Sequence, residues 1–100
     1  MSQLNLLIEK GKSIYGSQRA LAAEIGVPET HISMWQKGKR PCTAPDRAAL
    51  ATAVGEDPAE AALEAVLEGI DLESPQGKRA THALALALDR IRKSHITLMM

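Results

Sequence analysis

Aromatic residues are scarce in this chain of 100 residues, which has one Trp, one Tyr and no Phe. Its hydrophobic residues, 45% of the chain, are mostly Ala and Leu. A β-sheet uses more aromatic and β-branched residues than this, whereas Ala and Leu favour helices. No repeat with a period of about 20–50 residues is present, which excludes a solenoid. The composition and length predict one small all-α domain, with room for an appended element.

Cysteine and long apolar runs are also nearly absent. The single cysteine, Cys42, has no partner for an intrachain disulfide, so a reducing compartment is expected. The apolar run at residues 4–8 is followed at once by Glu9 and Lys10. It is too short for a signal-peptide core or for a bilayer span. The expected location is the cytoplasm, with no membrane contact.

The chain has no net charge, which alone is unpromising for a nucleic-acid-binding protein. The charges are nevertheless segregated along the sequence. Residues 1–54 carry a net charge of +3, residues 55–73 a net charge of −7, and residues 74–100 a net charge of +4. A chain of this kind can present a basic face even though its total charge cancels.

Hydrophobic periodicity and capping residues predict five helices followed by a sixth. The expected helices cover about residues 3–13, 18–25, 28–37, 44–54, 58–68 and 78–93. Ser17 is expected to cap the second helix, and Gly26 to end it in a left-handed turn. The predicted organisation is a domain at 1–68, a hinge at 69–77, and a C-terminal helix and tail at 78–100. Ser74-Pro75 offers an earlier start for the last helix.

Residues 17–38, SQRALAAEIGVPETHISMWQKG, form a helix, a glycine turn and a second helix. The small Ala22 at the crossing would let the two helices approach closely. Apolar side chains at helical spacing are expected to pack inward against the first and fourth helices; they are Leu21, Ile25, Val27, Ile32 and Trp35. The opposite side of the second helix of this pair would carry mostly short polar residues, which suit a DNA major groove.

This pattern resembles the lambda-repressor-like (Cro/repressor) helix-turn-helix family over about residues 4–68. The matching positions are Gln18, Leu21-Ala22, Ile25-Gly26-Val27, Ile32-Ser33, Trp35 and Gly38. The run PDRAALATAVGEDPAEAAL is similar to the continuation found in small phage-encoded regulators of that family. The resemblance implies phosphate contacts at Ser17 and Gln18, and base contacts at Glu29, Thr30 and Met34. Two departures from the family pattern are Pro28 in place of a Ser or Thr cap, and an acidic Glu29. They are compatible with cytosine readout or with a half-degenerate protein of weak DNA affinity.

Residue pattern and resemblance together predict a transcriptional regulator, most simply a phage or prophage repressor, that binds double-stranded DNA at an inverted-repeat operator as a homodimer. The expected DNA-binding residues are Ser17, Gln18, Arg19, Glu29, Thr30, His31, Ser33, Met34, Lys37, Lys39 and Arg40. The alternative is a protein-interaction module, such as an antitoxin that neutralises a partner protein and regulates its own gene. Its acidic fifth helix would then contact a basic partner.

No catalytic or metal-binding pattern competes with these interpretations. The three histidines and Cys42 lack the spacing of metal ligands, and no phosphate loop or nucleophile motif is present. Glu60, Glu64 and Glu68 follow one another at i, i+4 spacing and are expected to form a solvated face. The chain is therefore not expected to be an enzyme or to need a cofactor.

The predicted C-terminal helix is apolar on two sides. Leu84, Leu88 and Ile91 share one side, whereas Leu86 lies nearly opposite. A helix of this kind has two partners, and the four residues are the expected dimer interface. An ordinary packing helix is the alternative. The tail HITLMM is compatible with an exchanged strand, a continued helix or disorder.

Overall fold

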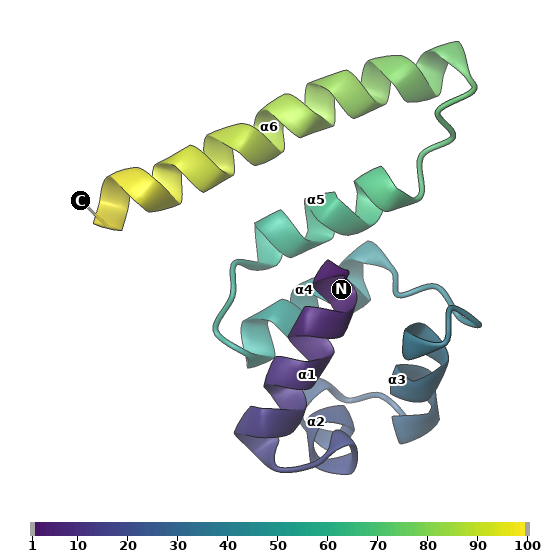
Figure 1. Cartoon of the computed structure of the whole chain (residues 1–100), viewed down its shortest axis with the longest axis vertical. Coiled ribbons are helices and arrows are strands. Elements are labelled where there is room, and N and C mark those ends of the chain that lie inside the picture. The colour runs from purple at the N-terminus through teal and green to yellow at the C-terminus, as the bar shows by residue number, and fades with distance from the viewer. Residues whose placement is uncertain (1, 100) are drawn as a thin grey trace.

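A computed structural model describes residues 2–99 of the chain and the side chains of residues 2–95. The helices, in chain order, are α1 (Gln3–Tyr15), α2 (Gln18–Ile25), α3 (Glu29–Gln36), α4 (Ala44–Ala53), α5 (Pro58–Glu68) and α6 (Pro75–Met99) (Figure 1). The described residues contain no strand, so the expected all-α class is confirmed for them. Of the alternatives for the tail, the structure has a continued helix as far as Met99; Met100 lies outside the described residues.

The helix ends follow the capping residues that the sequence offers. The Ser17 hydroxyl accepts a hydrogen bond from the Ala20 amide at 3.0 Å, and Gly26 ends α2 with a φ of 77°. Thr43 and Asp46 form a capping box at the start of α4. Pro28 precedes α3 without a side-chain cap, as expected from its lack of a hydroxyl or carboxylate group. Local chemistry therefore determines where most of these helices begin and end.

Helix α1 extends two residues beyond the predicted range, to Tyr15, and Gly11 lies in its interior. A Cβ atom at Gly11 would lie only 2.6 Å from a methyl group of Leu21. The missing side chain thus lets α2 pack closely against α1, and this contact compensates for the low helix propensity of glycine. Gly16, with a φ of 92°, then ends the helix.

The hydrophobic core lies between α1, α2, α3 and α4. Its largest completely buried side chains are those of Ile8, Leu21, Ile32 and Leu50, and Trp35 is 3% exposed. The full cluster of buried residues is Leu7, Ile8, Leu21, Ala22, Ile32, Trp35, Leu50, Ala51, Val54 and Ala61. The inward direction predicted for Leu21, Ile32 and Trp35 is therefore confirmed, and Ile25 and Val27 pack partly buried against the same cluster.

Helices α5 and α6 extend the molecule away from this core. Helix α5 packs on α4, and α6 packs on the other side of α5. Figure 1 shows α6 crossing the end of the molecule opposite α2. Of the α6 side chains that the structure describes, only Leu88 is a buried hydrophobic residue, at 5% exposed. The layers α6, α5, α1/α4 and α2/α3 thus follow one another along the molecule.

The expected hinge at residues 69–77 is shorter and more ordered than its sequence indicates. Helix α6 already begins at Pro75, so only residues 69–74 lie between the helices. The Ser74 hydroxyl donates to the Asp71 carbonyl oxygen at 3.1 Å and accepts from the Gly77 amide at 2.8 Å. A Cβ atom at Gly77 would lie 1.8 Å from the same Asp71 oxygen. This turn fixes the start of α6.

Candidate nucleic-acid interface

Helices α2 and α3 are held together by their turn and by one side chain. The Val27 amide donates to the Ala22 carbonyl oxygen at 3.0 Å. The Gln18 side-chain amide donates to the Ser33 hydroxyl at 2.7 Å and to the Glu29 carbonyl oxygen at 3.3 Å. With Ile32 and Trp35 buried beneath it, α3 has a fixed orientation relative to α2.

Most of the residues predicted to bind DNA are exposed on α2, on α3 and on the loop that follows α3. The exposed members are Ser17, Arg19, Glu29, Thr30, Met34, Lys37, Lys39 and Arg40. Met34 is 39% exposed. Three predicted residues, Gln18, His31 and Ser33, are only half-exposed. Because Gln18 and Ser33 bond each other, their polar groups are partly used within the protein. We call the set of exposed members the α2–α3 surface.

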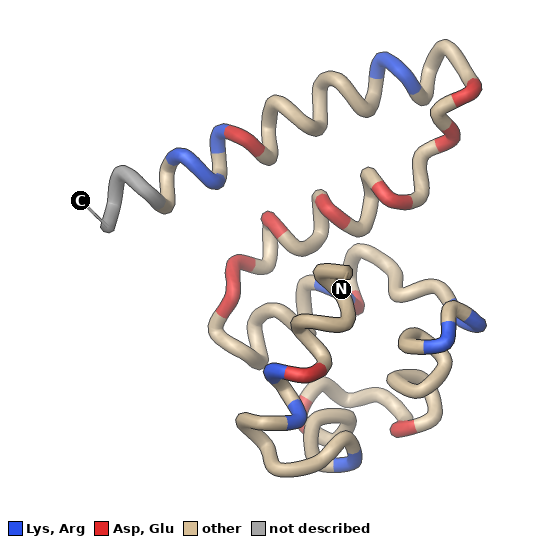
Figure 2. The backbone as a smooth tube through the Cα atoms, in the orientation of Figure 1, with Lys and Arg blue, Asp and Glu red and all other residues tan. Residues whose placement is uncertain are grey.

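The basic loop that follows α3 is folded back onto the end of that helix. Gly38 has a φ of 70°, which lets the chain reverse. The Lys39 amide then donates to the Met34 carbonyl oxygen at 2.9 Å, and the Arg40 amide donates to the same oxygen at 3.4 Å. These bonds hold Lys39 and Arg40 beside Met34. Figure 2 shows the resulting group of basic residues at the end of α3, away from the acidic residues of α5.

The basic residues of the N-terminal half divide into two groups. Three of the seven are neutralised within the protein: Lys10 pairs with Glu56 at 2.6 Å, Lys12 with Glu9 at 3.4 Å, and Arg47 with Glu68 at 2.9 Å. The other four form no ion pair with any residue that the structure describes; they are Arg19, Lys37, Lys39 and Arg40. Within the N-terminal half, the positive charge available to a ligand therefore belongs to the residues of the α2–α3 surface.

Arg47, which in the sequence is simply one of these seven basic residues, has a structural role. It is 3% exposed, and its guanidinium group also donates to the Gln3 side chain at 2.7 Å. Burial raises the pKa of the neighbouring Cys42 thiol to about 11, an effect that the Arg47 guanidinium opposes. At neutral pH this thiol is protonated, which makes it a poor nucleophile. The pairing of Arg47 with Glu68 joins α4 to the end of α5.

The acidic face predicted on α5 is only partly solvated, because its carboxylates form ion pairs with other helices. Glu60 and Glu64 both pair with Arg92 of α6, and Glu68 pairs with Arg47. The Asp57 carboxylate accepts a hydrogen bond from the Glu60 amide and has an oxygen 2.6 Å from Nε2 of His95. Both interactions lower the pKa of the Asp57 carboxyl group. The i, i+4 spacing on one helix could not reveal these partners because they come from α4 and α6.

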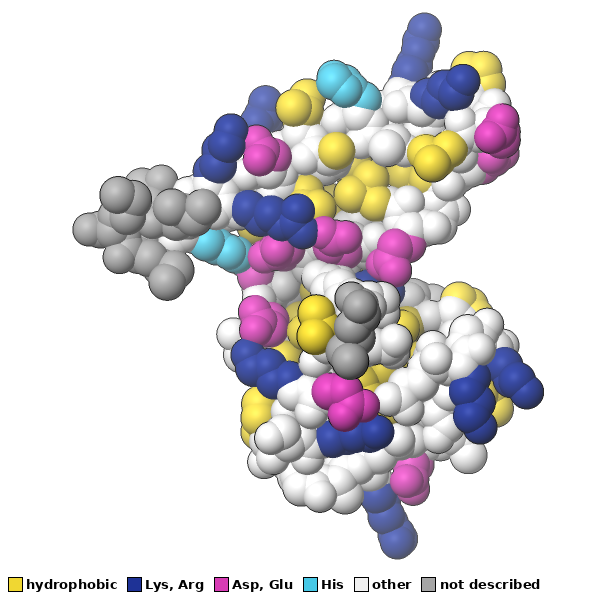
Figure 3. All heavy atoms as spheres, in the orientation of Figure 1, with side chains coloured by type: hydrophobic (Ala, Val, Ile, Leu, Met, Phe, Trp, Pro, Cys, Tyr) yellow, Lys and Arg dark blue, Asp and Glu magenta, His cyan; other side chains and the backbone are white. Residues whose placement is uncertain are grey.

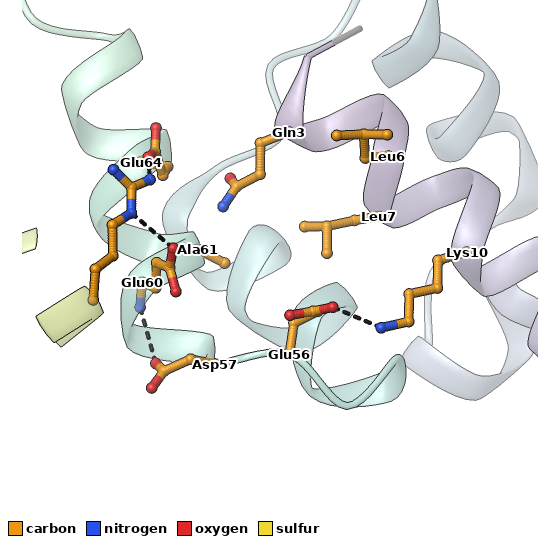
Figure 4. Close-up of a pocket in the computed structure, with 10 residues that line it drawn as sticks. Gln3, Leu6, Leu7, Lys10, Glu56, Asp57, Glu60, Ala61 and Glu64 are labelled. Atoms are coloured by element: carbon orange, nitrogen blue, oxygen red, sulfur yellow. Dashed lines mark hydrogen bonds and ion pairs between the residues drawn. The ribbon is translucent and has the colours of Figure 1, made fainter. Parts of the chain in front are cut away.

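A groove of about 280 Å³ lies between α1, α5 and α6. Figure 4 shows Leu6 and Leu7 on its α1 wall and Lys10 reaching Glu56. On the other wall, Glu60 and Glu64 bond Arg92. The charged groups that face the groove are therefore already paired with one another. Within residues 2–95, no cluster of His, Cys, Asp and Glu side chains could hold a metal ion.

The four residues expected to form a dimer interface point in two directions. Leu88 is buried within the chain, where α6 packs on α5, and Leu84 and Ile91 are half-exposed. Leu86 is 47% exposed on the outer side of α6. The two-sided pattern of α6 thus has one partner within the chain, and Leu86 is the most exposed of the four to any second partner.

Comparison with known proteins adds no assignment. No protein-family model, curated protein or solved structure matches the chain. None of the helices in the described part is both long enough and apolar enough to cross a lipid bilayer.

Proposed function

We propose that the protein is a sequence-specific, double-stranded-DNA-binding regulator of the lambda-repressor-like helix-turn-helix type, with α3 as the recognition helix. One observation carries the proposal. Helix α3, held by buried Ile32 and Trp35, exposes Thr30 and Met34 between basic residues that have no ion-pair partner among the described residues. Such a helix suits the major groove, with phosphates at its edges.

Each part of the α2–α3 surface has a role in this proposal. Lys37, Lys39 and Arg40 contact phosphates at the end of α3, and Arg19 contacts them at the start of α2. Thr30 and Met34 lie at i, i+4 spacing, where their methyl groups can contact thymine. Glu29 disfavours phosphate and accepts a hydrogen bond from a cytosine amino group. Gln18 acts chiefly by fixing α2 to α3.

We further propose that a homodimer forms on the operator, with two chains bound to adjacent half-sites of an inverted repeat. Within residues 75–95, the outer side of α6 offers only Leu86 as a large apolar contact, and it also carries Arg79 and Arg90. A two-fold contact there would bring like charges together. Repression of transcription, as in small phage regulators, is the activity that this arrangement favours. The antitoxin alternative has less support, since the carboxylates of α5 are engaged by Arg92 and Arg47.

The electrostatic part of the proposal is tested by a salt titration. Duplexes would be selected from a random library with the full chain, and their affinity measured by fluorescence anisotropy at several salt concentrations. Replacing Lys39 and Arg40 by Ala should reduce the slope of log K against log salt by about 2, because each lost phosphate contact removes about 0.9. The matched control replaces Lys10 and Lys12, whose charges are already paired. Equal slopes for the two double variants would contradict the proposed interface.

The base-contact part is tested on the selected duplex and on a scrambled one. Thr30→Ala and Met34→Ala should each lose roughly 1–3 kcal/mol of binding free energy on the selected duplex, and little on the scrambled one. Ala23→Ser, an exposed change on α2 outside the predicted contacts, serves as the control. If selection returns no preferred sequence, α3 does not act as a recognition helix.

A further inference from the structure

The outer side of α6 carries a second set of basic residues. Lys78, Arg79, His82 and Arg90 are all exposed, and at 100° per residue they lie within about 120° of one another around the helix. Lys93 extends the same side and pairs with Asp89 at 2.9 Å. Figure 3 shows Lys and Arg side chains along the edge of α6 that faces away from the rest of the molecule. We call Lys78, Arg79, His82 and Arg90 the α6 outer face.

The charges of this face are available for binding. Lys78, Arg79 and Arg90 form no ion pair with any residue in the described part of the chain. Arg92, only two residues after Arg90, points to the other side of the helix and pairs with Glu60 and Glu64. The basic residues of α6 therefore have two roles: Arg92 binds α5, whereas the residues of the α6 outer face point to solvent.

The arrangement of charged and apolar groups selects one kind of ligand. A second copy is disfavoured, because an antiparallel contact centred on Leu86 would place Arg79 opposite Lys93 and His82 opposite Arg90. A lipid surface is disfavoured because an amphipathic helix binds it through a broad apolar face. Among residues 75–95, Leu86 is the single large apolar residue on this side. A nucleic-acid backbone needs positive charge without an apolar face.

We propose that the α6 outer face is a second duplex-binding surface, which contacts phosphates without regard to sequence. Eleven residues separate Arg79 from Arg90, so the helix spreads its charge over about 16 Å. A duplex carries a phosphate charge every ~1.7 Å of its axis, so both arginines reach phosphates wherever the helix lands. Because α1, α4 and α5 lie between α6 and the α2–α3 surface, the second surface takes a separate segment of duplex (Figure 1).

The experiment uses the full chain in a Lys39→Ala/Arg40→Ala background, which weakens the proposed α2–α3 surface. The probe is a short duplex of random sequence, titrated by anisotropy at several salt concentrations. Adding Arg79→Ala and Arg90→Ala should weaken binding at least roughly tenfold and lower the salt slope by about 2. Arg79→Lys/Arg90→Lys should keep both the affinity and the salt slope, because it keeps the charge. Lys10→Ala/Lys12→Ala, which removes the same number of charges elsewhere, is the control. Unchanged affinity and slope in the arginine-to-alanine variant would overturn the proposal.

Two further measurements test whether the α6 outer face is a separate site and whether it prefers duplex DNA to lipid. The chain with both surfaces intact should bring two differently labelled duplexes together, whereas Arg79→Ala/Arg90→Ala should not; co-localisation that persists in this variant would overturn the assignment of the second site to the α6 outer face. Vesicles of anionic lipid should bind more weakly than the duplex, and the reverse order would also overturn the assignment. The salt titration and the vesicle comparison do not depend on the α2–α3 surface, whereas co-localisation needs both surfaces to bind a duplex, so the two proposals can fail independently.

Discussion

The region formed by α1–α4 and the region formed by α5 and α6 are stabilised in different ways. The first contains all the large fully buried side chains, Ile8, Leu21, Ile32 and Leu50. The second contributes Ala61 to that core and buries Leu88 between its own helices. What α5 and α6 have instead is a set of ion pairs around Arg92 and His95. Hydrophobic burial is insensitive to pH, whereas ion pairs are not, so the two regions should respond differently to mutation and to acid.

The largest effect is expected at Trp35, in the α1–α4 region. Trp35→Ala should cost about 3–5 kcal/mol of unfolding free energy, because it removes a large buried side chain and leaves a cavity. Trp35→Phe should cost much less, since the indole N–H has no hydrogen-bond partner in the described structure. Urea unfolding measured by circular dichroism checks both. If both variants lost the same unfolding free energy, packing of the aromatic ring at position 35 would not be the source of the stability.

A smaller and more local effect is expected at Leu88. Leu88→Ala should cost about 2–3 kcal/mol, the low end for a buried leucine, because Leu88 lies outside the main core, where α6 packs on α5. Amide hydrogen exchange should accelerate in α6 and stay unchanged in α2 and α3. Leu86→Ala is the matched control, because Leu86 is 47% exposed. Uniform acceleration across the whole chain would show that the two regions unfold as one unit.

The connection between the regions can be tested with a pair of glycines. Gly77→Ala should cost about 1–3 kcal/mol, because the new Cβ would meet the Asp71 carbonyl oxygen at 1.8 Å. Gly69→Ala should be nearly neutral, because its new Cβ would approach the nearest atom, a Val66 oxygen, only to 3.7 Å. Thermal unfolding of the two variants makes the comparison. If Gly77→Ala were as stable as Gly69→Ala, the turn would not fix the start of α6.

These contrasts also explain how far the sequence could be interpreted. The ends of α2 and α5, the capping by Ser17 and the burial of Trp35 follow from local patterns, and each was predicted. The roles of Arg47, Glu60 and Glu64 were missed because their partners lie on other helices. Gly77 was assigned to a hinge, although its lack of a Cβ atom lets the Asp71 carbonyl oxygen approach it closely. Local chemistry is visible in the sequence, whereas pairing between distant segments is not.

The candidate site shows the same division. The helical period predicted correctly that Thr30 and Met34 are exposed on α3. The exposure of the basic loop was also predicted correctly, from its charged sequence. The bond between Gln18 and Ser33 was not predicted, and it draws two expected contact residues into the protein. Both side chains belong to the pattern that resembles the repressor family, and the hydrogen bond gives them a structural role beside the predicted DNA contacts. Their distance depends on the crossing of α2 and α3, which the sequence does not specify.

The smallest effect is expected at Asp57, where the α5–α6 region should respond to acid. Its carboxylate accepts a hydrogen bond from the Glu60 amide and lies 2.6 Å from His95, and both lower its pKa below the ordinary value. Because the folded state favours the ionised form, this group stabilises the fold above the ordinary pKa of about 4. That contribution is lost as the pH falls through the lowered pKa of the folded state. Asp57→Ala should cost about 1 kcal/mol at neutral pH through loss of the cap.

Asp57→Asn provides the decisive comparison, because asparagine also caps helices but does not titrate. The stability difference between the wild type and Asp57→Asn should favour the wild type at neutral pH and shrink as the solution is acidified below about pH 4. Urea unfolding at a series of pH values measures this difference directly. Trp35→Phe, whose change lies in the α1–α4 region, should show a difference from the wild type that does not vary with pH. A pH-independent difference for Asp57→Asn as well would mean that the ion pairs of α5 and α6 do not distinguish the two regions.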